Sequence, residues 1–337
     1  MSRTEVRCRM RVGLVGYFGW GNFGDELMFQ LWRQRLGGSV DAHRVHDLLH
    51  RPYFQASARD AAAPLDAIVI GGGDLIHPDS ISPLYWNRAW LDKPVFVSGV
   101  GVAFERGGFR QDVPGRLTDF LGHPAVRSIG LRDAASAEWV GAQLGSDRVR
   151  QSPDLAFAFE LPPPLPRHRV VGIALRKRPS EDDRDTVARV VRWARERGLG
   201  TELLVLATGH TAQDELSHLS PAFPGVSVRS VGSVDEQCQA ISSYAVLFSA
   251  KFHGSVVALR YGTPTVSLRE THKIQGLRAQ LGAHAAPAFS AELLDRDAEV
   301  LRPGRLPALT ALEAAAEEEV AHVSSLVGSV GAAAPRA

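Results

Sequence analysis

The chain has 337 residues, of which 45% are hydrophobic and 22% are charged, and its formal net charge at pH 7 is +1. This composition is typical of a globular protein and excludes wholesale disorder. The small net charge argues against bulk nucleic-acid binding, which usually requires a strongly basic domain. The length indicates two domains of roughly 150 residues each rather than a single α/β sheet.

The cysteine count and the lengths of the apolar runs indicate the cellular compartment. Cys8 and Cys238 are the only cysteines, so a disulfide framework and a cysteine metal site are not expected. We predict two ordinary thiols in a reducing cytosol, with no metal and no cofactor. No apolar run approaches the roughly 20 residues of a membrane span. The apolar stretch Gly13–Phe18 is too short for a signal peptide, so we expect a cytoplasmic protein.

The first half of the chain alternates apolar runs with stretches of helical periodicity. The run before Gly71-Gly72-Gly73 is apolar apart from Asp66, which is the profile of a buried parallel strand ending in a turn. The predicted strands are Arg11–Phe18, Leu65–Ile70, Pro94–Val102, Val126–Leu131 and one near Val149, and the predicted helices are Asp25–Leu36 and Arg132–Leu144.

A proline cluster divides the chain. Residues 161–169 read Leu-Pro-Pro-Pro-Leu-Pro-Arg-His-Arg, which cannot continue a helix or a central strand and is therefore predicted to be a stiff linker. The alternation then restarts, with strands Val170–Leu175, Glu202–Ala207, Val226–Val231, Ala245–Ser249 and Thr263–Leu268, and helices Glu181–Arg197, Thr211–Leu219, Val234–Tyr244, Ser255–Tyr261, Lys273–Leu281 and Leu312–Val327. The Ala/Gly-rich tail is expected to fray.

This alternation predicts the α/β class. Strands that alternate with helices form parallel sheets with right-handed crossovers. We therefore expect two Rossmann-like, doubly wound domains, residues 1–160 and 170–337, facing each other across a cleft. Ligands of such folds bind outside the carboxyl ends of the strands, near helix N-termini, so residues just after strands are the candidates for a site.

The first candidate segment is glycine-rich and follows the first strand. Gly19, Gly21 and Gly24 match the G-x-G-x-x-G pattern of a dinucleotide site, with Asp41 or Asp47 at a suitable distance for a ribose. However, Asp25 and Glu26 follow the last glycine, where carboxylates would repel a pyrophosphate. The segment is therefore interpreted in three ways: a nucleotide loop, a tight turn with an acidic helix start, or an active-site loop.

Three further segments follow predicted strands. Gly71–Gly73 lets the backbone approach a ligand closely, although a sharp turn explains it equally well. Arg132, followed by Asp133 and Ser136, lies where a strand ends and a helix begins, and it is interpreted as a residue of the cleft or as a surface arginine next to a helix cap. Asp154 either reaches the same rim or forms an Asx-type turn. The run Arg176-Lys177-Arg178 follows the first strand of the second half. It is interpreted either as a solvated basic run or as an anion site.

The fifth segment concentrates the most chemistry. Lys251-Phe252-His253-Gly254-Ser255 follows an apolar strand and leads into a helix. A lysine charge, backbone amides at a helix N-terminus and a serine hydroxyl together predict a phosphate site. His253 adds a group that can carry a proton at neutral pH.

In this order, the segments resemble the polysaccharide pyruvyltransferase family. The matching pieces are Gly19-Trp-Gly-Asn22-Phe-Gly24-Asp25-Glu26, Gly71-Gly-Gly73, Arg132-Asp133-Ala-Ala-Ser136, Ser152-Pro-Asp154 and Lys251-Phe-His253-Gly254 with Gly262-Thr-Pro264. The resemblance implies two Rossmann-like domains of the GT-B type. It also implies transfer of pyruvate from phosphoenolpyruvate onto two hydroxyls of a sugar, which gives a cyclic ketal and free phosphate.

The resemblance implies catalytic and substrate-binding roles for particular residues. The implied catalytic residues are His253, Arg132 and Asp25, and the implied substrate contacts are Lys251, Gly254, Ser255, Asn22, Glu26, Gly73, Arg176 and Lys273. The acceptor is expected on the N-terminal domain and the donor phosphate on the C-terminal domain. Many members carry arginine where this chain has Lys251, so the charge is kept but bidentate recognition of an anion is lost.

Three other functions compete with pyruvyl transfer. A GT-B glycosyltransferase acting on a nucleotide sugar would share the fold, with Glu270 available to hold the sugar donor. A nicotinamide-dependent oxidoreductase rests on Gly19, Gly21 and Gly24 alone. A non-catalytic binding homologue would have kept the fold without the reaction.

Overall fold

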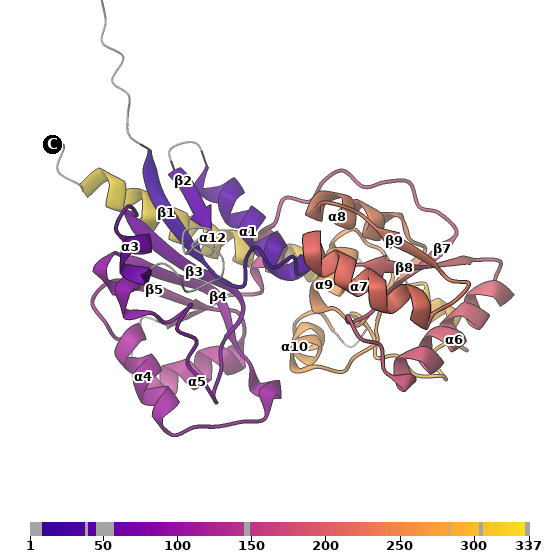
Figure 1. Ribbon diagram of the computed structural model, residues 1–337. Helices are drawn as coiled ribbons and strands as arrows, with labels where there is room; N and C mark the ends of the chain where they lie inside the picture. Colours follow the sequence, from indigo (N-terminus) through magenta and orange to yellow (C-terminus); the bar gives the residue numbers. More distant parts are fainter. Residues whose placement is uncertain are drawn as a thin grey trace, which may run out of the picture. The chain divides into compact units, whose positions relative to one another are not determined.

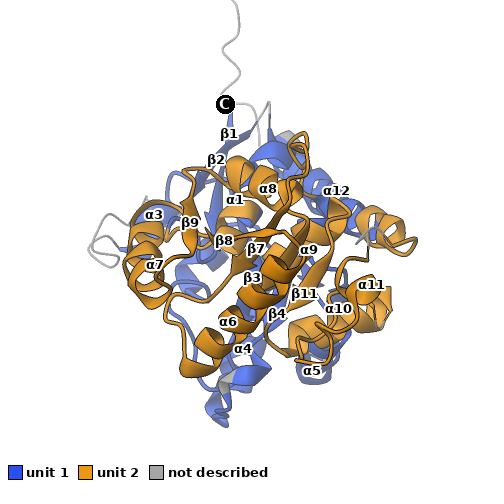
Figure 2. Ribbon diagram, turned by 90° about the vertical axis from the view of Figure 1, so that its right-hand side faces the viewer, with its two compact units in different colours: residues 1–19, 28–158, 315–337 blue, residues 20–27, 159–314 orange. Residues whose placement is uncertain are grey.

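The computed structural model describes residues 9–37, 40–44, 57–144, 149–282, 284–302 and 306–333. The chain divides into two compact units (Figures 1 and 2). Unit 1 is Met1–Gly19, Met28–Ala158 and Ala315–Ala337, and unit 2 is Trp20–Leu27 and Phe159–Ala314. Each unit contains a parallel sheet, so the predicted α/β class is confirmed.

Unit 1 is built on a parallel sheet with the strand order β2-β1-β3-β4-β5-β6. The chain first adds β2 on one side of β1 and then continues from β3 on the other side, so the order reverses between β1 and β3. The strands are β1 (Met10–Val15), β2 (Val40–Arg44), β3 (Ala67–Ile76), β4 (Val95–Val102), β5 (Val126–Leu131) and β6 (Val149–Gln151).

Helices cover both faces of this sheet. Val97 and Ile129 share an apolar cluster with side chains of α4 (Asp112–Leu121) and α5 (Ala134–Leu144). The next residue along each strand, Ser98 and Gly130, meets Glu319 of helix α12 (Leu309–Ala333) instead. Because successive side chains of a strand point to opposite faces, α12 covers the face that α4 and α5 leave (Figure 1).

The glycine run lies inside a strand rather than in a turn after it. β3 was predicted to end before Gly71, but it continues to Ile76. Gly72 and Gly73 have φ values of 88° and 84°, which favour glycine, and the pairing with β4 shifts register between Gly73 and Ile76. The glycines therefore make an irregular strand end instead of a loop.

Unit 2 has a parallel sheet with the order β11-β10-β7-β8-β9. The order reverses between β7 and β10, which is where doubly wound folds bind ligands. The strands are β7 (Val170–Ala174), β8 (Gly200–Val205), β9 (Ser227–Ser230), β10 (Val246–Ser249) and β11 (Thr265–Ser267). The helices are α6 (Glu181–Glu196), α7 (Gly209–Ala222), α8 (Val234–Ser243), α9 (Phe252–Arg260), α10 (His272–Leu281) and α11 (Asp297–Val300).

The two units differ from the predicted domains at both ends of the chain. Residues Trp20–Leu27, at the start of α1 (Phe23–Leu36), belong to unit 2, and Ala315–Ala337 belong to unit 1. The tail after Val327 was expected to fray, but α12 continues to Ala333, with Gly331 beside Met10 of β1. The proline segment forms neither helix nor strand over residues 161–168, as predicted.

Some elements carried too weak a sequence signal to be predicted. The edge strand β2 lacks an apolar run, and its Asp41, the ribose candidate, pairs with His43. Asp47, the other ribose candidate, lies outside the described residues. Helices α3 (Ala58–Ala62), α4 and α11 were also missed, as were the 3₁₀ helices Arg88–Asp92, Phe104–Arg106 and Leu155–Ala158.

Glu319 gives a test of how α12 is held on unit 1. This side chain is 2% exposed and accepts hydrogen bonds from Ser98 Oγ at 2.9 Å and Arg150 Nε at 3.2 Å. Glu319→Ala should lower the free energy of unfolding by about 1–3 kcal/mol, because the buried Ser98 hydroxyl loses its acceptor. Urea denaturation measures this loss.

The neighbouring Glu318→Ala is the matched control. Its side chain is 78% exposed and lies 3.8 Å from Arg150, so we expect a change within about 0.5 kcal/mol. Equal effects of the two substitutions would contradict the role given to Glu319.

Candidate functional site

The start of helix α9 lies at the sheet position where ligands are expected in unit 2. The helix begins at Phe252, with Lys251 as its N-cap, and not at Ser255 as predicted. Ala250, just before it, donates its backbone N–H to the carbonyl of Ala174 at the end of β7. His253 and Gly254 therefore lie in the first helical turn, beside the reversal of strand order between β7 and β10.

Lys251 is engaged inside unit 2. Its ammonium donates to Glu215 Oε1 at 2.6 Å and to the carbonyl of Leu206 at 2.9 Å, and the two side chains are only 17% and 6% exposed. Burial raises the pKa of Glu215 and lowers that of Lys251, whereas their mutual attraction opposes both shifts. The contact of Lys251 with a substrate phosphate stays a prediction.

The glycine-rich segment after β1 packs on unit 2. Thr208 donates its backbone N–H to the carbonyl of Gly21 at 2.8 Å, and Thr211 donates its hydroxyl to the carbonyl of Trp20. Asn22 forms an antiparallel bridge with Ala207. Gly21 has a φ of 83°, and a Cβ there would lie 2.2 Å from the Thr208 oxygen, so this position requires glycine.

Side chains of the same segment bond its own backbone. Asn22 Oδ1 accepts from the N–H of Gly24 at 3.2 Å, and Glu26 Oε1 accepts from the N–H of Gly21 at 3.0 Å. A bound pyrophosphate would need the backbone N–H groups of Gly21 and Gly24 as donors. Because both already bond side chains of the segment, the dinucleotide interpretation is disfavoured. Asn22 and Glu26 thus shape the turn, and their predicted contacts with a substrate stay predictions.

Gly24 brings the two motifs together. A Cβ on Gly24 would lie 2.0 Å from Nδ1 of His253, 2.6 Å from Cε1 and 2.7 Å from Cγ. The backbone of the turn therefore lies directly against the imidazole, and the half-buried Asp25 is the next residue along the helix. Unit 2 thus unites His253 with the turn that carries Asn22, Asp25 and Glu26.

Gly254 and Ser255 pack inward. A Cβ on Gly254 would lie 2.8 Å from both Leu206 Cδ1 and Ser249 Oγ, so a larger residue would displace one of these side chains. Ser255 is fully buried, and its hydroxyl has no hydrogen-bond partner within the described part of the chain. Both residues fit a close approach of α9 to the sheet, and their substrate contacts stay predictions.

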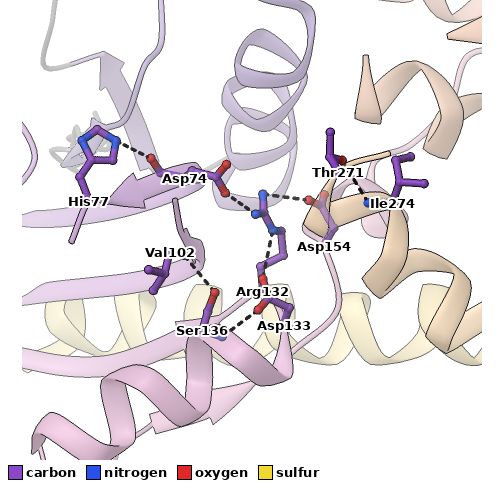
Figure 3. Close-up of polar contacts among 9 residues, drawn as sticks. All are labelled: Asp74, His77, Val102, Arg132, Asp133, Ser136, Asp154, Thr271 and Ile274. Atoms are coloured by element: carbon purple, nitrogen blue, oxygen red, sulfur yellow. Dashed lines mark hydrogen bonds and ion pairs between the residues drawn. The ribbon is translucent and has the colours of Figure 1, made fainter. Parts of the chain in front are cut away.

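Arg132 is the centre of an acidic cluster in unit 1 (Figure 3). It follows β5, is 5% exposed, and donates from Nη2 to Asp74 Oδ1. Asp133 and Asp154 each place a carboxylate oxygen 3.7 Å from its guanidinium. Burial lowers the pKa of Arg132, the three carboxylates raise it, and the net shift is upward. An anion bound here would have to compete with Asp74.

The backbone packs closely against the guanidinium of Arg132. A Cβ on Gly101 would lie 2.5 Å from Arg132 Nη2 and 2.8 Å from Asp74 Oδ1. Asp133 and Asp154 also accept hydrogen bonds from the backbone N–H groups of Ser136 and Ala156. Gly73 precedes Asp74 at the irregular end of β3, and its predicted contact with substrate stays a prediction. Asp74 was not predicted as a site residue, although it directly follows the glycine run.

The remaining predicted cations lie on other elements of unit 2. Arg176 is exposed after β7, and the neighbouring Lys177 pairs with Asp214. Lys273 lies in the first turn of α10, whose cap is Thr271 accepting from the N–H of Ile274 at 3.3 Å (Figure 3). Glu270, reserved for a sugar donor, bonds Arg278 at 3.0 and 2.8 Å. The substrate contacts of Arg176 and Lys273 stay predictions.

The described residues carry neither a metal-binding cluster nor a membrane-spanning helix. Within the described ranges, no three His, Cys, Asp or Glu side chains are grouped to hold a metal ion. Among the helices that the structure describes, none is both long and apolar enough to cross a membrane. Cys238 is buried, and burial raises the pKa of its thiol; Cys8 lies outside the described residues.

Solved structures place the chain in a fold class. UDP-N-acetylglucosamine 2-epimerase from Rickettsia bellii is 12% identical, with a TM-score of 0.55 over 97% of this chain and 99% of that one. The enzyme from Neisseria meningitidis bound to UDP-GlcNAc is 10% identical, with a TM-score of 0.53 over 95% and 99%. With its two parallel sheets, the chain has a GT-B-like α/β fold.

A sequence match identifies the family of the chain. The model of the polysaccharide pyruvyl transferase family matches residues 22–272, which is more than half of the chain. The chain belongs to this family, as the motifs predicted, and it is therefore a transferase. None of the curated proteins matches it in sequence.

The pair of Lys251 and Glu215 supports a stability prediction with a pH dependence. Lys251→Met should lower the free energy of unfolding by about 3–5 kcal/mol at neutral pH, because a buried carboxylate loses its cation. Burial raises the pKa of Glu215 in the folded protein. In the variant no Lys251 opposes the effect of burial on Glu215. The loss should therefore be smallest below the ordinary Glu pKa of about 4.3, where Glu215 is protonated, and should grow as the pH rises and the buried carboxylate ionises without a cation. Urea denaturation at several pH values measures it.

The double variant Lys251→Met with Glu215→Leu is the control. Because both charges are removed, most of the stability should return and the added pH dependence should disappear. A single variant that is as stable as the wild type at neutral pH would show that the pair is not buried in solution.

Proposed function

We propose that the chain transfers pyruvate from phosphoenolpyruvate onto two hydroxyls of a sugar-containing acceptor, forming a cyclic ketal. The observation that carries the proposal is the junction in unit 2, where two motifs within the family match meet at the imidazole of His253. A histidine at the start of a helix, at the edge where the strand order reverses, is placed to act on a bound anion.

The atoms and electrons of the proposed reaction balance without an oxidant or a reductant. A proton adds to the methylene carbon of phosphoenolpyruvate, and the first acceptor hydroxyl forms a C–O bond with the carboxyl-bearing carbon and loses its proton. The second hydroxyl then forms another C–O bond at this carbon, and the C–O bond to phosphate breaks. Phosphate leaves with the electron pair, and the second hydroxyl proton is released to a base.

His253 is the proposed proton donor. His253 is partly exposed as a residue, with its ring nitrogen Nε2 buried, and a histidine can hold or release a proton at neutral pH. Asp25, the residue after Gly24, is the proposed base for an acceptor hydroxyl. In unit 1, Arg132 is the proposed donor of hydrogen bonds to an anionic substrate group. Arg176 and Lys273 are the proposed additional cations of unit 2.

The family supports a saccharide as acceptor in general. We propose a cell-wall or exopolysaccharide sugar, with a nucleotide sugar or a glycosylated metabolite as further acceptors that carry suitable hydroxyl pairs. We also propose that the protein acts in the cytoplasm. The proposed reaction uses phosphoenolpyruvate as a co-substrate and no cofactor.

Phosphate release tests the proposal. With phosphoenolpyruvate and a competent diol sugar, we expect phosphate and a ketal in equal amounts, and His253→Ala should lower kcat by on the order of 10²-fold or more, because a proton donor is lost. His253→Gln, which keeps a polar side chain of similar length, is a second variant in case alanine impairs folding. A coupled phosphate assay with mass spectrometry measures both products.

His218→Ala is the matched control. His218 lies on α7 of the same unit and bonds the carbonyl of Asp214, so its replacement should leave turnover unchanged. Near-normal turnover of both His253 variants would remove the proton-donor role. A thermal shift with a UDP-sugar or NAD, but none with phosphoenolpyruvate, would favour one of the competing functions instead.

A further inference from the structure

Two neighbours restrict the imidazole of His253 within unit 2. On one side, the backbone of Gly24 is so close that an added Cβ would lie 2.0 Å from the ring nitrogen Nδ1. The aromatic ring of Phe252 is a second neighbour, with a centroid distance of 5.1 Å and an interplanar angle of 76°. The imidazole therefore has limited freedom to change its rotamer.

The turn that carries Gly24 cannot retreat easily. Its backbone is tied to unit 2 by the bonds from Thr208 to Gly21 and from Thr211 to Trp20. Within the turn, Asn22 and Glu26 bond the N–H groups of Gly24 and Gly21. A side chain added at position 24 would thus push on the imidazole rather than move the turn.

The backbone on both sides of His253 is fixed as well. Lys251, the N-cap of α9, is anchored by its ammonium to Glu215 and to the carbonyl of Leu206. Gly254, on the other side of His253, packs against Leu206 and Ser249. The backbone that carries the imidazole therefore has as little room to move as the turn that faces it.

From these contacts we infer that Gly24 is a positioning residue that holds the imidazole of His253 in a single orientation, with Asn22 and Glu26 shaping the turn for this purpose. The kinetic part of this inference rests on the proposed function. Glycine is needed at this position because the ring occupies the space of a side chain. The turn is thus a structural support for the histidine, and not a nucleotide loop.

Gly24→Ala tests the inference, with Gly115→Ala as the control. Both are glycines in the first turns of helices, but no atom lies within 4 Å of a Cβ added at Gly115. Gly24→Ala should lower kcat by on the order of 10²-fold with little change in KM for phosphoenolpyruvate, because a small displacement of a catalytic group suffices for such a loss. It should also shift the limb of the pH–rate profile that reports His253. Gly115→Ala should change neither.

Two further readouts do not depend on turnover. In ¹H–¹⁵N spectra of the histidine rings, the signals that disappear in His253→Ala should shift in Gly24→Ala and stay in place in Gly115→Ala. In a double-mutant cycle, Gly24→Ala should lower the urea midpoint in the wild type but not in His253→Ala, where the space is vacant.

The outcomes separate the two proposals. If the wild type releases no phosphate from phosphoenolpyruvate while the ring signals and the stability cycle behave as expected, the proposed function fails and the positioning role stands. Unchanged ring signals in Gly24→Ala, an equal loss of stability in both backgrounds, or an unchanged kcat in an active enzyme would each overturn the positioning role.

Discussion

The approach of the Gly24 backbone to the imidazole of His253 is the constraint on which the rest of unit 2 depends. It requires glycine at position 24, and it requires a turn held firmly enough to keep that glycine in place. Gly21 with its positive φ, the bonds from Thr208 and Thr211, and the carboxylate of Glu26 meet the second requirement. Segments more than 200 residues apart in the sequence thereby form one local structure.

Buried charge shapes both units in a similar way. Lys251 and Glu215 compensate each other beneath α9, and Arg132 is surrounded by three carboxylates beside β5. Removing one partner of such a group leaves an uncompensated buried charge, which destabilises the fold. These clusters also mean that the cations most visible in the sequence are already engaged by acidic partners.

The sequence predicted the fold class, the alternation of strands and helices and the family, because those depend on local patterns and motif order. It placed His253 at a strand-to-helix junction but began the helix at Ser255, since Phe252 and Gly254 carry no strong helix signal. It could not identify Glu215 as the partner of Lys251, or Asp74 as the partner of Arg132. These residues lie 36 and 58 positions away from their partners, and nothing local encodes the pairing.

If His253 acts on phosphoenolpyruvate while its imidazole is held against the turn Trp20–Leu27, this turn and the start of α9 should respond to that ligand together. Hydrogen–deuterium exchange with and without this ligand tests the claim most directly, because it reports the backbone of both segments at once. We expect amides of residues 20–27 and 251–255 to become protected together on addition of phosphoenolpyruvate, and inorganic phosphate to protect the α9 segment alone. Protection confined to other parts of the chain, or none at all, would contradict the claim.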